Sequence, residues 1–169
     1  MINPLITNML ISNMFPQLQN TNCLLLVCGK TAGKIFQIDG RTCELKETIS
    51  SAAVEMYADK NPQVELDHDF KGHSKTLIKT NRTEKQDRLI KLVDISLHEH
   101  LNTEHREIFI FCPQEISKKL LESIQPTIRI PIEVVRYGNF LKFHPKDLLE
   151  LVERVIEDRS TVHQQQTLV

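Results

Sequence analysis

The segment from Gly29 to Lys34, Gly-Lys-Thr-Ala-Gly-Lys, has the residue types of a phosphate-binding loop and follows an apolar run. Such a loop binds phosphates through backbone amides, and it needs four residues between its glycines and then Lys and a hydroxyl residue that reaches magnesium. Here three residues separate Gly29 from Gly33, and Ile35 stands at the hydroxyl position. The residues that follow alternate as a strand and do not begin a helix. The segment therefore indicates a glycine-containing connection between strands and not a nucleotide site.

Residues 71–91 are a strongly basic segment, with seven basic residues, two acids and a net charge of +5 in a chain whose total charge is -1. Clustered Lys and Arg attract phosphates, with an affinity that falls steeply as salt rises. The candidate nucleic-acid-binding residues are Lys71, Lys75, Lys79, Arg82, Lys85 and Arg88. A solvated, flexible loop that leads into a helix explains the same composition without a ligand. Only Phe70 adds an aromatic ring, so base stacking is not indicated in this segment.

The cysteines lie in or beside apolar runs and form no C-x-x-C pair, which is typical of buried thiols in a reducing compartment. They are Cys23, Cys28, Cys43 and Cys112. Covalent catalysis needs a thiol of depressed pKa and a nearby base, and the helix predicted from Pro113 could favour a thiolate at Cys112. The sequence identifies no histidine partner. We predict no catalytic residue, and an enzyme that uses Cys28 or Cys112 stays an alternative that a thiol probe would test.

The carboxylates and histidines do not follow the spacing of a known metal site. A two-metal nuclease needs acidic residues on the first strands, and the apolar runs 24–28 and 108–112 contain none. His98 and His100 are two residues apart on a predicted helix, so they point in different directions. A second group falls in a predicted loop without a known ligand motif: Asp67, His68, Asp69 and His73. We predict neither a metal nor a cofactor.

The length of 169 residues, with 40% hydrophobic and 25% charged residues, is typical of one globular domain. The 21 Lys and Arg against 22 Asp and Glu exclude a uniformly basic protein, so any anion-binding surface must be local. The first 28 residues carry no charge, but Asn and Gln residues and Pro16 interrupt the apolar run before it is long enough to span a membrane. We expect a soluble cytoplasmic protein without a membrane span.

The N-terminal half predicts one short helix and three strands. Asn3-Pro4 is a helix-start signal, and apolar residues within 2–10 fall on one helical face. The run 24–28 is typical of a buried strand, and 34–38 and 42–49 alternate on either side of the Asp39-Gly40 turn. We therefore expect a helix and linker over 1–21, an antiparallel meander of three strands, and a long basic loop over 50–82.

The C-terminal half predicts strands that alternate with helices. Helical spacing begins at Thr83, and further helices begin at Pro113 and Pro145. The intervening strands are expected at 108–112 and 128–135, and a polar, frayed tail at 159–169. Interleaved strands and helices require parallel crossovers. The predicted fold class is α/β, with one mixed five-stranded sheet covered by helices in a ribonuclease H-like arrangement, as a single domain over 22–158.

Three segments carry a resemblance to a known family: 23–40, 108–121 and 134–151. The chain resembles the bacterial host attachment protein family, which is similar to the middle domain of archaeal and eukaryotic peptide-chain release factors and of stalled-ribosome rescue proteins. Release factors carry a Gly-Gly-Gln tip, whereas the equivalent stretch here, Phe70-Lys-Gly-His-Ser-Lys-Thr76, has one glycine and no glutamine. The resemblance therefore does not imply peptidyl-tRNA hydrolysis. It implies a basic loop that reaches ribosomal RNA.

Together these observations predict a non-catalytic binding module that associates with the ribosome or another RNA through the basic loop. The alternative is a protein-interaction or host-attachment factor. In that case the uncharged N-terminal helix would contact a protein partner or a second copy in a homodimer.

Overall fold

The computed structural model describes residues 8–11, 14–51 and 74–166, and it describes side chains for these residues apart from 8, 74–81 and 163–166. Strands and helices alternate in the second half of the chain, as the sequence predicts. The elements are β1 (Asn8–Leu10), the 3-10 turn η1 (Leu18–Asn20), β2 (Cys23–Cys28), β3 (Ala32–Ile38), β4 (Thr42–Ser50), α2 (Ser74–His100), β5 (Glu107–Cys112), α3 (Gln114–Ile124), β6 (Ile132–Tyr137) and α4 (Pro145–Gln166).

The strands form one mixed sheet with the order β1-β4-β3-β2-β5-β6. The antiparallel meander of β2, β3 and β4 is confirmed, and β5 and β6 continue the sheet parallel to β2 on its other side. The α/β class and the mixed sheet are thus as predicted. The described residues contain six strands where five were expected, because β1 pairs with the outer edge of β4, with Met9 opposite Cys43.

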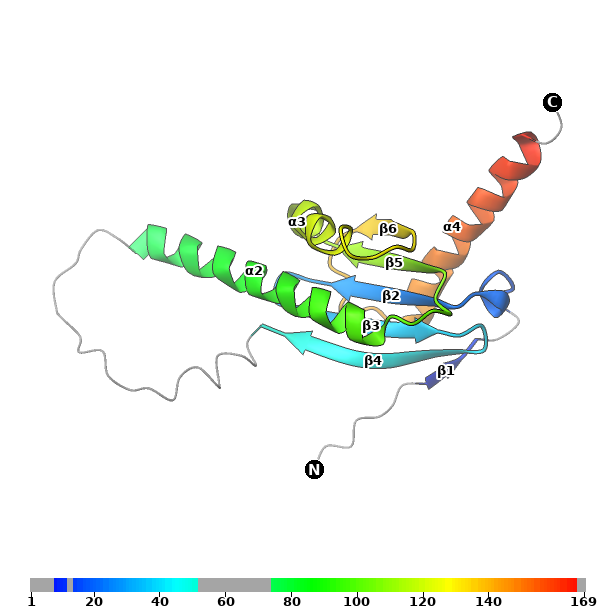
Figure 1. Ribbon diagram of the computed structural model, residues 1–169, viewed down its shortest axis with the longest axis horizontal. Helices are drawn as coiled ribbons and strands as arrows, with labels where there is room; N and C mark the ends of the chain where they lie inside the picture. Colours follow the sequence, from blue (N-terminus) through cyan, green and yellow to red (C-terminus); the bar gives the residue numbers. More distant parts are fainter. Residues whose placement is uncertain (1–7, 12–13, 52–73, 167–169) are drawn as a thin grey trace.

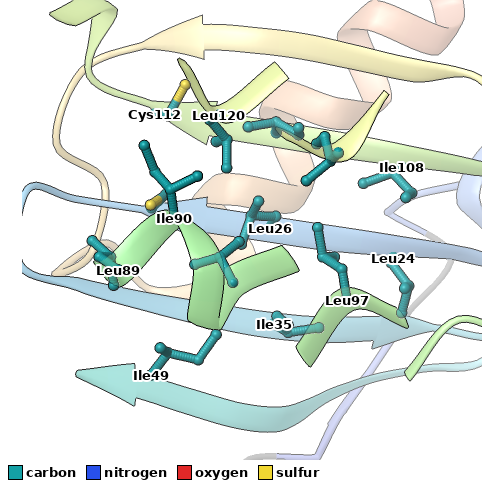
Figure 2. Close-up of a cluster of buried hydrophobic side chains, with 14 of the residues drawn as sticks. Leu24, Leu26, Ile35, Ile49, Leu89, Ile90, Leu97, Ile108, Cys112 and Leu120 are labelled. Atoms are coloured by element: carbon teal, nitrogen blue, oxygen red, sulfur yellow. The ribbon is translucent and has the colours of Figure 1, made fainter. Parts of the chain in front are cut away.

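Helices cover both faces of the sheet, and Figure 1 shows α2 and α3 over one face and α4 over the other. Successive residues of a strand point to opposite faces, so β2 serves both layers. Leu24 and Leu26 pack into the layer under α2 and α3, which also contains Val93. Figure 2 shows the two leucines together with Leu89 and Leu97 of α2. Leu25 packs into the layer under α4. The central strands are therefore buried on both sides, which accounts for their continuous apolar runs.

The helix predicted near the N-terminus is wrong for residues 8–10, which form β1 instead, and residues 1–7 lie outside the described part of the chain. A helix of this length is marginal in water, because the free energy cost of nucleation exceeds the stabilisation from a few hydrogen bonds. The edge of β4 offers unpaired backbone groups that a short strand can satisfy. The helical face that would mediate self-association is thus not formed at 8–10.

The helix predicted from Thr83 begins nine residues earlier, at Ser74, so the predicted loop over 50–82 is helical from 74 onward. Residues 52–73 lie outside the described part of the chain. Figure 1 shows the first half of α2 extending past the end of the sheet. This half has no sheet to cover, so its sequence lacks the apolar spacing that signals a helix, although Lys, Arg and Glu are good helix formers.

Two further boundaries differ from the prediction. The strand expected at 128–135 is Ile132–Tyr137, because Ile128 instead packs under α2 and α3 beyond the end of α3. The polar tail expected to fray from residue 159 continues as α4 to Gln166. Arg159 accounts for part of this, since its guanidinium pairs with Glu107 of β5 and with Glu133 of β6.

Candidate functional site

The candidate site is a cleft at the edge of the sheet where the three parallel strands end. From β2 the chain continues to β3 on one side, whereas from β5 it continues through α3 to β6 on the other side. Chains that diverge in this way leave a crevice beyond the carboxyl ends of the strands, where α/β proteins commonly bind ligands. Here the cleft has a volume of about 650 Å³. Its lining residues are Lys30, Thr31, Pro113, Gln114, Glu115, Tyr137, Gly138, Asn139 and Leu141.

One wall of the cleft is the connection between β2 and β3, which contains the glycine motif. The amide of Gly29 donates to the carbonyl oxygen of Ala32 at 2.8 Å, which closes a tight turn. A Cβ atom at Gly29 would lie 2.4 Å from Cδ1 of Leu141, so glycine lets the Leu141 side chain approach this closely. The interpretation of this segment as a strand connection is confirmed.

The opposite wall is the loop after β6, and a buried aromatic ring holds it in place. Phe140 packs on Phe111 of β5 with the ring centroids 5.0 Å apart, and on Phe143 at 4.7 Å. The ammonium group of Lys34 donates to the carbonyl oxygen of Leu141 at 2.9 Å. The loop is therefore anchored from both β3 and β5. The side chain of Tyr137, directly before this loop, lines the cleft and is 53% exposed.

Glu115 is the acidic residue among those that line the cleft. Its carboxylate accepts a hydrogen bond from Lys30 at 3.2 Å. Its pKa is lowered, first by a hydrogen bond to its own backbone amide, then by Lys30 and by the positive charge of Arg82. The effect of Arg82, which lies on α2, is the smallest of these. Lys119 of α3 also pairs with Asp87 of α2 at 2.9 Å, which ties the two helices together.

The structure places part of the predicted nucleic-acid-binding set on one helix. Arg82, Lys85 and Arg88 are exposed on α2. Lys75 and Lys79 also belong to α2, but their side chains lie outside the described part of the structure, as does the whole of Lys71. Positions three apart on a helix are rotated by about 60° from one another, so these cations wind around the helix and do not share a single flat face.

Sequence reasoning missed the segment 136–146, which was interpreted only as a strand-to-helix step. It reads Arg-Tyr-Gly-Asn-Phe-Leu-Lys-Phe-His-Pro-Lys and contains three basic residues, three aromatic residues and no acid. The segment 71–91, by contrast, has basic residues without an aromatic one. Tyr137 and Asn139 from this segment line the cleft, and Lys142 is exposed.

The histidines considered as metal ligands go to separate partners. His98 hydrogen-bonds to Asp94 within α2, whereas His100 reaches Glu47 of β4 at 3.0 Å, and His105 is buried. In the ranges that the structure describes, no three His, Cys, Asp or Glu side chains gather as metal ligands. The second group, Asp67, His68, Asp69 and His73, lies outside those ranges.

The four cysteines are buried free thiols, as predicted. Burial raises the pKa of Cys28 to about 12 and that of Cys112 to about 11. The start of α3 therefore does not produce a thiolate at Cys112 in neutral solution, because removal of the thiol from water outweighs the helix dipole. Burial and the raised pKa values argue against a cysteine nucleophile at either position.

Comparisons with known proteins identify no family for this chain. No family model matches it, and no curated protein matches it. Among solved structures, it is similar to Dom34 of S. cerevisiae, a translation termination-like factor involved in RNA quality control pathways and interacting with Hbs1. The two are 12% identical with a TM-score of 0.40, over 88% of this chain and 42% of that chain. The chain thus spans less than half of this neighbour's length.

The resemblance to the bacterial host attachment family consequently stays a prediction. The fold class is established by the observed sheet order and not by the likeness to Dom34. Among the residues that the structure describes, no helix combines the length and the apolar character needed to cross a bilayer.

Proposed function

We propose that the protein is a non-catalytic RNA-binding module, and that the basic strip of α2 binds the RNA backbone. The basic strip consists of Arg82, Lys85, Arg88 and Lys91, which are all exposed. The observation that carries the proposal is their position on a helix whose first half extends past the end of the sheet. Such a helix can approach an extended polyanion without steric conflict with the rest of the domain.

One of the two acids beside the basic strip has a partner outside it. Asp87, one of the two acids within 71–91, is paired with Lys119 of α3 at 2.9 Å, so its charge is compensated from outside the strip. Neither Arg88 nor Lys91 forms an ion pair with a described residue. These cations can therefore exchange small counterions for phosphates, and release of those counterions drives binding.

The positive charge of 71–91 is local, since the chain as a whole has a net charge of -1. Local positive charge next to a cleft suits a strand whose backbone lies on the helix and whose other groups turn toward the protein. Within the described residues the chemistry favours binding over catalysis, since the thiols are neutral and Glu115 is held in an ion pair.

The proposal is tested by fluorescence anisotropy with a labelled single-stranded RNA over about 25 to 200 mM salt. Wild-type protein should bind at low salt, with an affinity that falls by about 0.7 logarithmic units per logarithmic unit of salt for each phosphate contact. The double variant Arg82→Glu, Arg88→Glu should bind roughly tenfold more weakly and with a shallower salt dependence.

A matched control is Arg154→Glu, which reverses one exposed charge on α4, on the opposite face of the sheet. It should retain wild-type affinity. No binding at low salt, or equal losses for Arg154→Glu and Arg82→Glu, would overturn the proposal. Co-sedimentation with ribosomes at low salt tests whether the RNA that is bound is ribosomal. Competition by polyglutamate distinguishes an acidic protein partner from RNA.

A further inference from the structure

We infer that the cleft at the carboxyl edge of the sheet is a subsite for an unpaired nucleobase, which stacks on Tyr137. This inference rests on the proposed function, because the base belongs to the single-stranded RNA whose backbone lies on the basic strip. It adds a class of ligand, since a protein that binds only phosphates would accept duplex and single-stranded RNA alike.

The ring of Tyr137 is the first observation. It is an aromatic side chain at the end of an edge strand, it is 53% exposed, and it lines the cleft. The other aromatic rings of this region are used within the protein, since Phe140 is buried on Phe111 and is covered in turn by Phe143. An accessible ring inside a cleft offers the flat apolar face on which any base can stack.

The polar lining is the second observation. The carboxamides of Gln114 and Asn139 belong to the same cleft and are exposed. Each carboxamide has both donors and an acceptor, the combination that the edges of unpaired bases require. Asn139 is partly fixed, since its Oδ1 atom accepts from the amide of Leu141 at 3.4 Å, which leaves its NH₂ group for a ligand.

The charges around the cleft place phosphates beside the base. Lys30 lines the cleft and pairs with Glu115, and the charge of Arg82 on α2 adds a smaller effect on the same carboxylate. A nucleotide in the cleft would therefore continue onto the basic strip of α2. A volume of about 650 Å³ accommodates a base with its ribose, since it lies within the range of small-molecule sites.

The walls of the cleft are held in place without a ligand. The loop after β6 is fixed by Phe140, by the hydrogen bond from Lys34 to Leu141, and by the close approach of Leu141 to Gly29. A ligand that enters such a site loses little free energy to ordering the protein.

The test uses the emission of Tyr137 itself. The chain has no Trp and two Tyr, so in the variant Tyr57→Phe the side chain of Tyr137 is the sole tyrosine emitter. Titration with an RNA of about eight nucleotides should quench this emission, because a stacked base quenches tyrosine. An abasic strand of equal length and charge should bind at least fivefold more weakly, should leave the emission unchanged, and so separates stacking from phosphate binding.

Three substitutions complete the experiment. Tyr137→Leu should lower the affinity for the RNA by roughly 5- to 100-fold, and Tyr137→Phe should retain it because the ring is kept. Val162→Ala is the control, since Val162 is also an exposed apolar side chain, lies on α4 and does not line the cleft, and it should bind like wild type. Melting temperatures verify that each variant is folded.

The outcomes separate the two claims. If the intact and abasic strands bind equally and Tyr137→Leu is neutral, while Arg82→Glu still weakens binding, the base subsite is overturned and the proposed function stands. Equal affinity for duplex RNA also overturns the subsite. If neither strand binds at low salt, the proposed function fails and the subsite fails with it.

Discussion

Lys30 in the β2–β3 turn and Glu115 at the start of α3 meet at the cleft, with Nζ and Oε1 3.2 Å apart. Both side chains are largely exposed, at 43% and 64%, so the pair contributes little to stability. Its effect is on the charge of the site. Glu115 partly compensates both Lys30 and Arg82, which are cations that an RNA phosphate would otherwise meet directly.

Glu115→Gln is therefore expected to strengthen RNA binding. Removal of one negative charge beside two cations should raise the affinity by about 2- to 5-fold at low salt, with a smaller gain at high salt. Because the pKa of Glu115 is lowered, its carboxylate stays ionised at mildly acidic pH, and the gain in affinity should persist there. Anisotropy titrations at two salt concentrations measure the change.

Glu122→Gln is the control for this substitution. Glu122 is also an exposed acid on α3, at 63% side-chain exposure, but its partner is Lys118 and it does not line the cleft. It should change the affinity by less than Glu115→Gln. Equal effects of the two variants would show that only the net charge matters and not the position of Glu115.

Two glycines should differ in their tolerance of alanine. Gly40 has a φ of +85° in the β3–β4 turn, and a Cβ there would lie 2.4 Å from the backbone carbonyl oxygen of Gln19. Neither the backbone conformation nor this oxygen adapts easily, so Gly40→Ala should lower the free energy of unfolding by roughly 1–3 kcal/mol. At Gly29 the obstacle is the end of the Leu141 side chain, which can rotate.

Gly29→Ala should consequently cost about 1 kcal/mol or less while it displaces Leu141 and reshapes the cleft. Urea unfolding compares the two variants through their midpoints at constant slope. Gly40→Ala should lose more free energy of unfolding, whereas Gly29→Ala should lose more RNA affinity. The reverse order would contradict the assigned contacts.

The parts of the fold that could be predicted from sequence are those with a strong periodic signal. The apolar runs of β2 and β5 and the prolines at the starts of α3 and α4 each identified their element, because burial on two faces and helix starts leave local patterns. The first half of α2 left none, and Figure 1 shows that it extends past the end of the sheet. The pairing of β1 depends on a partner edge more than thirty residues away, with Met9 opposite Cys43.

The candidate site was predicted only in part, for a similar reason. A run of Lys and Arg on one segment is visible in the sequence, and three of its members are exposed on α2. The cleft unites residues from 30, 115 and 137, which only the parallel arrangement of β2, β5 and β6 brings together. Tyr137 was overlooked because it lies beyond the strand predicted at 128–135, whereas β6 continues to Tyr137 at the edge of the sheet.

His105 should make stability depend on pH. The side chain is buried, its Nδ1 atom accepts from the amide of Asn102 at 3.0 Å, and burial lowers its pKa below 6.5 despite an opposing effect of Glu104. Above the unfolded value of 6.5 the imidazole is neutral in both states and the stability contribution is complete. As pH falls below 6.5 the unfolded state takes up the proton first, so stability decreases until the folded pKa is reached.

Unfolding free energies between about pH 7.5 and 5 measure this effect, which cannot exceed about 1.4 kcal/mol per pH unit for one proton. His105→Gln keeps an acceptor for the Asn102 amide and should flatten the dependence. His98→Gln, at an exposed position on α2, should leave it unchanged. A wild-type stability that stays constant down to pH 5 would show that His105 titrates normally.

Arg159 should make the end of α4 part of the domain and not a dispensable tail. Its guanidinium donates to Glu107 at 2.8 Å, pairs with Glu133, and lies 5.5 Å from the ring centroid of Phe109. It thus joins α4 to β5 and β6 in a position that is partly shielded from water. Arg159→Ala should lower the free energy of unfolding by about 1 kcal/mol, since solvent screening limits each pair.

Arg154→Ala, at an exposed position on the same helix, should have no measurable effect. Truncation after Asp158 should cost at least as much as Arg159→Ala, because it removes the same guanidinium together with the last turns of α4. An unchanged urea midpoint for the truncated chain would instead place the domain boundary at 158, as the polar composition of 159–169 predicts.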